Sequence, residues 1–389
     1  MIYALAIFIF LRPFICSPAF PKINLFYAIA LFIFLLIWIL LKKPRLPEKN
    51  IFGGIMAFSG SLAIAAILTK SPTSMLMNVL QYMSGILLFL ICRVMPYAQT
   101  DKILQTIIAS GITICLLGLH QFFFDFPGTL HYLNNPQVVD PLVTQFIQQK
   151  RVYSVLITPN TLGAYLIMLL PLFLFLRNKI WLLPLGGVLI LTKSIGTFLT
   201  LLITFPFYAY QRRLSNLSIF FLFLGVILTS IGIIWWRSST PTHDFNPGFS
   251  LDMRWQYWKE TWAIIKLHPI TGIGLGNFNL PDARYTHNLF LQLWAETGIA
   301  GMLSFIYLIS LLLHKAWQTM NTTLSPQRPT ALFFAVTVFL VHNMIDFSFF
   351  LPEVSLIWCV LLGLACNPSA PPDVASMPVG NNSNQTKSL

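Results

Sequence analysis

Apolar stretches long enough to form membrane-crossing helices recur along the whole chain, separated mostly by short polar turns. An α-helix needs roughly 17–25 apolar residues to cross a bilayer. We therefore predict an all-α fold, a polytopic membrane bundle of about 12 transmembrane helices. The predicted spans lie near residues 1–20, 23–41, 51–69, 74–95, 102–124, 155–176, 180–193, 195–210, 216–237, 287–313, 330–350 and 353–366.

Three of these spans depart from the regular pattern. Arg12 and Pro13 interrupt the first one, and the spans at 180–193 and 195–210 are short for a full crossing, which fits tilted or partly re-entrant helices. The first stretch lacks both a basic start and a small-residue cleavage site, so we expect it to be retained as a helix and not removed as a signal peptide.

One long polar interruption, over residues 238–286, divides the apolar pattern and ends just before His287. The tail after residue 366 is rich in Pro, Ser and Asn, which predicts disorder. The predicted organisation is N-terminal transmembrane helices (1–124), transmembrane helices with a first outer loop (125–237), an extracytoplasmic loop with an amphipathic helix (238–286), C-terminal transmembrane helices (287–366) and a disordered tail (367–389).

Composition supports a membrane protein, because 56% of residues are hydrophobic and only 9% are charged, against about 25% in soluble domains. A net charge of +12 would suggest a nucleic-acid partner in a soluble chain. Here the cations flank apolar spans, so we expect them to set topology and contact membrane lipids, with no nucleic acid bound. The five cysteines lie in or beside apolar segments without paired spacing, so neither disulfides nor a zinc site is predicted.

Lysine and arginine in short loops predict the orientation. With the N-terminus inside, the short inner loops receive Lys42, Lys43, Arg45, Lys49, Arg93, Lys102, Arg177, Lys179, Arg212, Arg213, Lys315 and Arg328. Both termini are then cytoplasmic. The outer face receives the loops at 125–154 and 238–286, the turn at Lys193, His287 and the turn after Asp346.

The segment 254–268 has the pattern of an amphipathic helix. Trp255, Trp258, Trp262 and Ile265 fall on one helical stripe, which is typical of a helix lying at head-group depth. Arg254 lies at the edge of this stripe. Two interpretations stay open: an anchor on ordinary phospholipid, or a clamp on a lipid diphosphate, which a guanidinium can hold bidentately.

The glycines at alternate positions in 271–277 lack the dinucleotide-binding spacing, so a tight turn or a backbone anion nest explains them better. Asn288, Gln292 and Glu296 recur every fourth residue, and such a polar stripe in a membrane helix faces a cavity or the bundle interior. His287, at the head of that helix, is either an interfacial residue or a general base. The nearby cations Arg254 and Arg284 favour the second interpretation.

Two further groups are candidates on the predicted outer side. His342 and Asp346 form an i,i+4 pair on the span 330–350, either as a structural hydrogen bond or as part of a polar cavity. Arg151 precedes the step Pro159-Asn160, which interrupts the start of the next span and exposes backbone groups. No cluster has metal-ligand spacing, so we predict neither a metal nor a cofactor.

Together these motifs resemble the O-antigen ligase and O-antigen polymerase superfamily of bacterial membrane glycosyltransferases, over roughly residues 150–350. The matching segments are Arg151-Val152-Tyr153-Ser154 with Pro159-Asn160 and Pro171, Arg254-Trp255-Gln256-Tyr257-Trp258, 268–278, His287-Asn288-Leu289-Phe290-Leu291-Gln292 with Glu296-Thr297-Gly298, and 341–347. The chain departs from the family at Ser194-Ile195-Gly196, where the family has Ser-Arg-Gly; Lys193 supplies a point charge there but no bidentate fork.

The resemblance implies a metal-independent, inverting transferase of lipopolysaccharide or polysaccharide biosynthesis, in the cytoplasmic (inner) membrane. It implies a glycan donor linked to undecaprenyl diphosphate at the outer face and a lipid A core or another glycan as acceptor. Arg254 would be the catalytic loop arginine and His287 the essential histidine. Arg284, Lys193 and Arg151 would assist Arg254 on the diphosphate. A transporter or flippase, and a non-catalytic lipid-binding scaffold, remain alternatives; charge gathered at one face without an internal repeat favours the enzyme.

Overall fold

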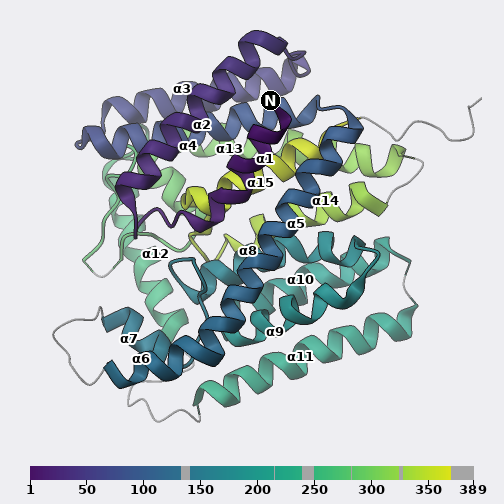
Figure 1. Ribbon diagram of the computed structural model, residues 1–389. Helices are drawn as coiled ribbons and strands as arrows, with labels where there is room; N and C mark the ends of the chain where they lie inside the picture. Colours follow the sequence, from purple (N-terminus) through teal and green to yellow (C-terminus); the bar gives the residue numbers. More distant parts are fainter. Residues whose placement is uncertain (133–140, 214, 239–248, 282, 324–326, 369–389) are drawn as a thin grey trace, which may run out of the picture.

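The computed structural model describes residues 1–132, 141–213, 215–238, 249–281, 283–323 and 327–368 (Figure 1). These described residues form helices, turns and loops without a β-strand, so the all-α prediction is confirmed for them. The helices are α1 (Ile2–Leu11), α2 (Pro21–Lys42), α3 (Lys49–Ile67), α4 (Pro72–Arg93), α5 (Tyr97–His120), α6 (Phe126–Tyr132), α7 (Pro141–Gln148), α8 (Pro159–Phe175), α9 (Leu182–Thr192), α10 (Ile195–Gln211), α11 (Asn216–Ser238), α12 (Phe249–Leu267), α13 (Leu289–Thr322), α14 (Gln327–His342) and α15 (Pro352–Ala365), with short 3₁₀ or π turns at Arg12–Phe14, Gln121–Asp125, Lys179–Trp181 and Ser348–Phe350.

Each predicted span overlaps at least one of these helices. Six helical segments in the described part are long and apolar enough to cross a membrane: Pro21–Lys42, Lys49–Ile67, Pro72–Arg93, Tyr97–Thr129, Asn216–Trp236 and Leu289–Thr322. The other helices that overlap predicted spans are shorter than this criterion requires. Several membrane crossings are therefore supported, and the number of about twelve stays a prediction. The predicted tail from residue 369 onward lies outside the described residues.

Two predicted spans end earlier than expected. α1 stops at Leu11 and a 3₁₀ turn follows at Arg12–Phe14, because Pro13 has no N–H to continue the α-helical hydrogen-bond ladder. α14 stops at His342, so the prediction that Asp346 lies on the same helix is wrong. Side chains close the turn that follows: the Oδ1 of Asn343 accepts from the backbone N–H of Phe349 at 2.7 Å. Such side-chain hydrogen bonds offer the backbone an alternative to the helix.

Helices far apart in the sequence pack side by side in the bundle (Figure 1). α4 packs on α15, α3 on α13, and α8 on α14, while α11 lies at the margin against α10. Most of α8 is buried, including Tyr165 and Phe173, which are fully enclosed. This places α8 in the bundle core, where it brings its first turn beside the start of α10 and the end of α14.

Loops that were predicted to share one side of the membrane contact one another in the bundle. At one end, Lys315 pairs with Glu48 at 2.6 Å and Arg328 pairs with Asp101 at 2.6 Å, so loops predicted to lie inside meet one another. At the other end, the Nδ2 of Asn277 donates to the backbone oxygen of Leu68, joining two loops predicted to lie outside. The side of the membrane that each end faces stays a prediction.

Candidate active site

α12 packs on the start of α13. The indole Nε1 of Trp258 donates to the backbone oxygen of Thr286 at 3.1 Å, and Trp262 meets Trp294 edge-on with ring centroids 5.4 Å apart. Ile265 is buried, whereas Trp255 remains 58% exposed. The predicted apolar stripe is therefore partly a packing face within the protein, and α12 holds Arg254 beside the turn that carries His287.

His287 sits in a tightly held turn with a left-handed backbone, φ 54°. The Thr286 hydroxyl donates to the Asn288 carbonyl at 2.7 Å and accepts from the Asn288 N–H at 3.0 Å. The side chain of Asn288 caps α13 by accepting from two backbone N–H groups, each at 3.0 Å. A non-glycine residue adopts this conformation only where its surroundings enforce it, so the turn orients the imidazole rigidly. Asn288, predicted to contact substrate, has a capping role here.

The imidazole of His287 lies between two aromatic rings. Tyr257 of α12 stacks on it with centroids 5.9 Å apart, and Phe347 meets it edge-on with centroids 4.7 Å apart. Its Nδ1 is buried and has no hydrogen-bond partner among the described residues. This nitrogen is therefore available to a ligand that enters the site.

Charged groups from two other segments, Arg254 on α12 and Asp346 after α14, act electrostatically on His287. Burial lowers the pKa of His287 to about 4; the Asp346 carboxylate acts in the raising direction and the Arg254 guanidinium in the lowering direction. Asp346 also acts on Arg254 itself, where burial is the larger effect and lowers the pKa of the guanidinium. The predicted catalytic pair, Arg254 and His287, is thus within electrostatic range of one carboxylate, and the imidazole is neutral near pH 7.

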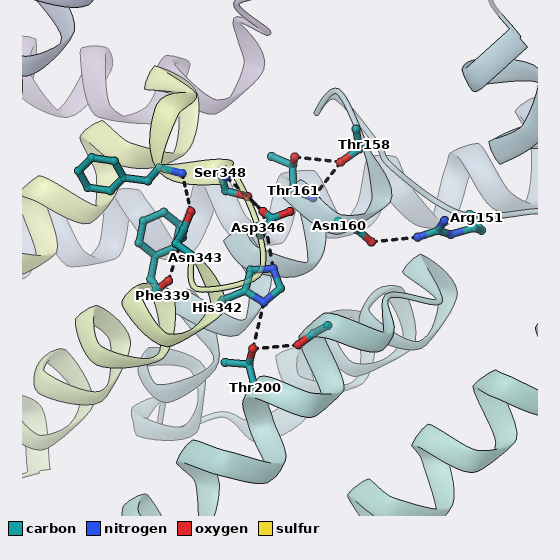
Figure 2. Close-up of polar contacts among 12 residues, drawn as sticks. Arg151, Thr158, Asn160, Thr161, Thr200, Phe339, His342, Asn343, Asp346 and Ser348 are labelled. Atoms are coloured by element: carbon teal, nitrogen blue, oxygen red, sulfur yellow. Dashed lines mark hydrogen bonds and ion pairs between the residues drawn. The ribbon is translucent and has the colours of Figure 1, made fainter. Parts of the chain in front are cut away.

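His342 and Asp346 form a buried pair next to the start of α10 (Figure 2). The Nε2 of His342 lies 3.7 Å from the Oδ2 of Asp346, and its Nδ1 lies 3.1 Å from the Thr200 hydroxyl. Asp346 also accepts hydrogen bonds from the backbone N–H and hydroxyl of Ser348. A Cβ placed on Gly196 would lie 3.6 Å from the His342 ring, so the Ser194-Ile195-Gly196 turn packs directly on this histidine.

Arg151 and Lys193 are neighbours on the same side of the bundle. Arg151 donates from Nε to the Thr192 carbonyl at 3.1 Å. Its Nη2 donates to the Asn160 side chain at 3.0 Å (Figure 2). Lys193 donates to the Gln149 carbonyl at 2.7 Å, and its Nζ lies 3.7 Å from the centroid of the Trp236 ring. Both cations are buried and are held by protein groups.

Arg284, Gln292 and Glu296 line a different space, a cavity of about 290 Å³ that also reaches Arg12 and that we call the Arg12 cavity. Gln292 donates to Glu296 at 3.1 Å, and Glu296 accepts from the backbone N–H of Gly276 at 3.1 Å. Two members of the predicted polar stripe, Gln292 and Glu296, therefore line a cavity, whereas Asn288 does not. Glu296 also ties the glycine-rich loop (residues 271–277) to α13.

The glycine-rich loop is a tight turn. Its backbone donors already have protein acceptors: Gly274 donates to the Glu296 carbonyl at 3.0 Å and Ile273 to the Ala295 carbonyl at 2.9 Å. The loop thereby packs on α13 where that helix is broken at Gly298, which has φ 70°. Of the two interpretations left open, the turn is the one that these contacts favour over an anion nest.

Arg12 and Glu353 were not among the predicted site residues. Their side chains form an ion pair at 3.2 Å with exposures of 2% and 0%, joining positions 341 residues apart. A signal was present, because an ionisable residue inside an apolar span is by default a functional candidate. In the sequence, Arg12 stands out only as an interruption of the first predicted span.

No group of three or more His, Cys, Asp or Glu side chains in the described part of the chain could hold a metal ion. Residues 180–306 match the family model described as O-antigen ligase. This region contains Lys193, α12 with Arg254, the glycine-rich loop and the His287 turn; it leaves out Arg151, His342 and Asp346. None of the curated proteins matches the chain.

Proposed function

We propose that this multi-pass membrane protein, a member of the O-antigen ligase and polymerase superfamily, transfers a glycan from undecaprenyl diphosphate to an acceptor hydroxyl. The reaction would take place at the outer face of the cytoplasmic membrane. The acceptor would be a lipid A core, as for a ligase, or another lipid-linked glycan, as for a polymerase.

The observation that carries the proposal is that Arg254, His287 and Asp346, from three separate segments, lie within electrostatic range of one another. Transfer from a diphosphate needs positive charge where the leaving group develops negative charge, and a base where the acceptor loses its proton. A guanidinium beside a neutral imidazole supplies both functions. The left-handed turn at His287 holds the imidazole before substrate arrives, so reorganisation during the reaction is small.

In the proposed step, the acceptor oxygen attacks the anomeric carbon on the face opposite the diphosphate. The new carbon–oxygen bond forms as the bond to the diphosphate oxygen breaks, so the configuration inverts. The electron pair leaves with undecaprenyl diphosphate, and the acceptor proton passes to His287. A bound diphosphate would raise the pKa of His287 from about 4 toward neutrality, because negative charge favours the imidazolium.

The remaining predicted residues have supporting roles in this proposal. Arg151 and Lys193 would add positive potential on the donor side and no metal would be required, while exposed Arg284 would steer the anionic donor toward the site. His342 and Asp346 would hold the Arg254 and His287 side chains in place. The turn that lacks the family's arginine packs on His342, and Lys193, the C-cap of α9, is the cation that directly precedes this turn.

The test is transfer in vitro from a defined undecaprenyl-diphosphate glycan to a panel of lipid A core and lipid-linked acceptors. We expect His287→Ala to lower kcat by about 10²–10⁴-fold and Arg254→Ala by about 10²–10³-fold, the usual losses of a general base and of a charge stabiliser. His268→Ala and Lys259→Ala are matched controls, because both side chains are exposed on or just after α12. They should retain wild-type rates.

Wild-type-like transfer by either catalytic variant would contradict the assigned roles. A wild-type protein that moves the lipid-linked glycan across a bilayer without transferring it would support the transporter alternative instead. Insertion of each variant is checked by its yield in the membrane fraction.

A further inference from the structure

The Arg12 cavity is a polar space distinct from the His287 site. It is lined by the turn after α1, the start of α2, one face of α4, the Arg284–Tyr285 segment and the start of α15. Along α4 its wall runs from exposed Thr73 to Ser84, which is 1% exposed. The volume of about 290 Å³ is near the lower limit for small-ligand sites, so the cavity suits a sugar-sized group and not a whole lipid.

Three buried side chains on this wall carry polar atoms without hydrogen-bond partners among the described residues. They are Arg12 through Nε and Nη1, Asn24 through Oδ1 and Ser84 through Oγ, and each residue is 1% exposed. An unpaired buried polar group is costly, about 1–3 kcal/mol. Their gathering around one cavity indicates a polar ligand.

The chemistry of these groups distinguishes between ligands. Arg12 offers donors, Asn24 an acceptor and Ser84 a hydroxyl that can do both. A phosphate oxygen can only accept, so it would leave the acceptor on Asn24 unsatisfied. Sugar hydroxyls both donate and accept, and they can satisfy all three groups together.

The charge on the wall is balanced, which also disfavours an anion. Arg12 is paired with Glu353 at 3.2 Å, and Arg284 lies within electrostatic range of Glu296. Ser17 donates from its backbone N–H to the other oxygen of Glu353 at 3.2 Å, so this carboxylate is fixed beside Arg12. A neutral ligand fits such a wall better than a phosphate or diphosphate does.

Aromatic contacts connect the cavity to His287. Tyr285 lines the cavity and stacks on Phe347 with centroids 4.7 Å apart and planes at 6°. Phe347 in turn meets the His287 ring edge-on at 4.7 Å. A group bound against Tyr285 is therefore separated from the base by a single aromatic side chain.

We propose that the Arg12 cavity binds a neutral, hydroxyl-rich sugar unit of one of the glycan substrates, next to the site of transfer. The identification of that sugar as part of a substrate rests on the proposed function; the binding of a sugar does not. Either the donor glycan or the acceptor can supply this unit.

Binding is tested on the full-length protein in sugar-free lipid nanodiscs, by thermal unfolding in the presence of methyl glycosides of common neutral hexoses or of inorganic pyrophosphate. At least one glycoside should raise the Tm in a saturable manner. Asn24→Leu and Ser84→Ala should weaken that binding about tenfold, as expected for a lost hydrogen bond to a buried group. Neither change should alter the response to pyrophosphate.

The ligand-free Tm provides the matched control. Ser84→Ala removes a hydroxyl without a hydrogen-bond partner, so its ligand-free Tm should stay constant or rise. Asn24→Leu removes an oxygen without a partner and a long contact of Nδ2 with the Met77 sulfur at 3.9 Å, so its ligand-free Tm should stay close to that of the wild type. Ser61→Ala removes a buried hydroxyl that donates to the Phe58 carbonyl at 2.7 Å outside the cavity. It should lower the ligand-free Tm and leave glycoside binding intact. The absence of any glycoside effect, or a selective loss of the pyrophosphate effect in Asn24→Leu, would overturn the proposal.

Transfer kinetics then identify the source of the sugar. With Asn24→Leu, a higher KM for the acceptor at unchanged donor KM assigns the cavity to the acceptor, and the reverse assigns it to the donor. Unchanged KM values for both would overturn the substrate assignment. If glycosides bind but no transfer occurs with any acceptor, the proposed function fails while the sugar site stands.

Discussion

Tyr257 stacks on His287 with ring centroids 5.9 Å apart and planes inclined by 21°. Tyr257 lies three residues after Arg254, and positions three apart are neighbours on a helix surface. Arg254 and the Tyr257 ring that packs on the imidazole therefore lie on one face of α12. The position of α12 on α13 becomes a determinant of the site geometry, although these helices are joined by a long loop.

Loss of this stacking contact should reduce catalysis without abolishing binding. We expect Tyr257→Ala to lower kcat roughly tenfold to a hundredfold, because small displacements of a catalytic group have effects of this size. Tyr257→Phe keeps the ring and should retain most of the rate. Trp255→Ala, on the same helix and 58% exposed, is the control. The measurement is steady-state transfer; equal rates for the Ala and Phe variants would show that the ring has no positioning role.

The pH dependence of kcat/KM should report the lowered pKa of His287. A general base must be neutral, so activity is retained above its pKa and lost as the pH falls through that value. In the free enzyme this loss should occur near pH 4 and not near 6.5. Arg254→Gln should move the acid limb upward, because it removes a cation that lowers the pKa, and Asp346→Asn should move it downward.

Ionisation of the donor substrate contributes equally to the pH profiles of the wild type and the two variants. The shifts between these profiles therefore report the enzyme alone. An acid limb near 6.5 in the wild-type enzyme, or limbs that do not move in these directions, would contradict the electrostatic arrangement around His287.

Gly298 should be intolerant of substitution. Its φ of 70° is unfavourable for other residues, and a Cβ there would lie 1.8 Å from the backbone oxygen of Ile270. Gly298→Ala must displace the loop that packs on α13, so we expect a loss of stability of about 2 kcal/mol or more. Gly53→Ala in α3 is the control, since no atom lies within 4 Å of a Cβ there. Thermal unfolding of the two variants should differ clearly; similar Tm values would exclude a tight contact at Gly298.

The buried Arg12–Glu353 pair should show strong coupling. Arg12→Met leaves the carboxylate unpaired and should cost about 3–5 kcal/mol, as for other broken buried pairs. Glu353→Gln keeps an acceptor for the Ser17 N–H but removes the charge. The double variant Arg12→Met/Glu353→Gln should be less destabilised than the sum of the single variants. A double-mutant cycle by denaturant unfolding measures this coupling, and additive effects would mean that the pair contributes little.

Much of the helical structure followed from the sequence, because the length of an apolar stretch and the position of a proline decide locally where a helix can form and begin. α2 begins at Pro21 and α15 at Pro352, and each predicted span overlaps a helix. Arg254 and His287 could be singled out as cationic and titratable groups in one polar region. The end of α14 could not be predicted, because it depends on hydrogen bonds that the side chains of Asn343 and Asp346 accept from backbone N–H groups of the following turn.

By itself, then, the sequence determined that the chain is apolar enough for membrane helices and that its chemistry lies in a few polar segments. Only the tertiary structure decided which groups meet. Arg12 pairs with Glu353 across 341 positions, and Asp346 acts on both Arg254 and His287. The reason is physical: helix formation depends on neighbouring residues, whereas a buried charge finds its partner only through the packing of helices distant in sequence.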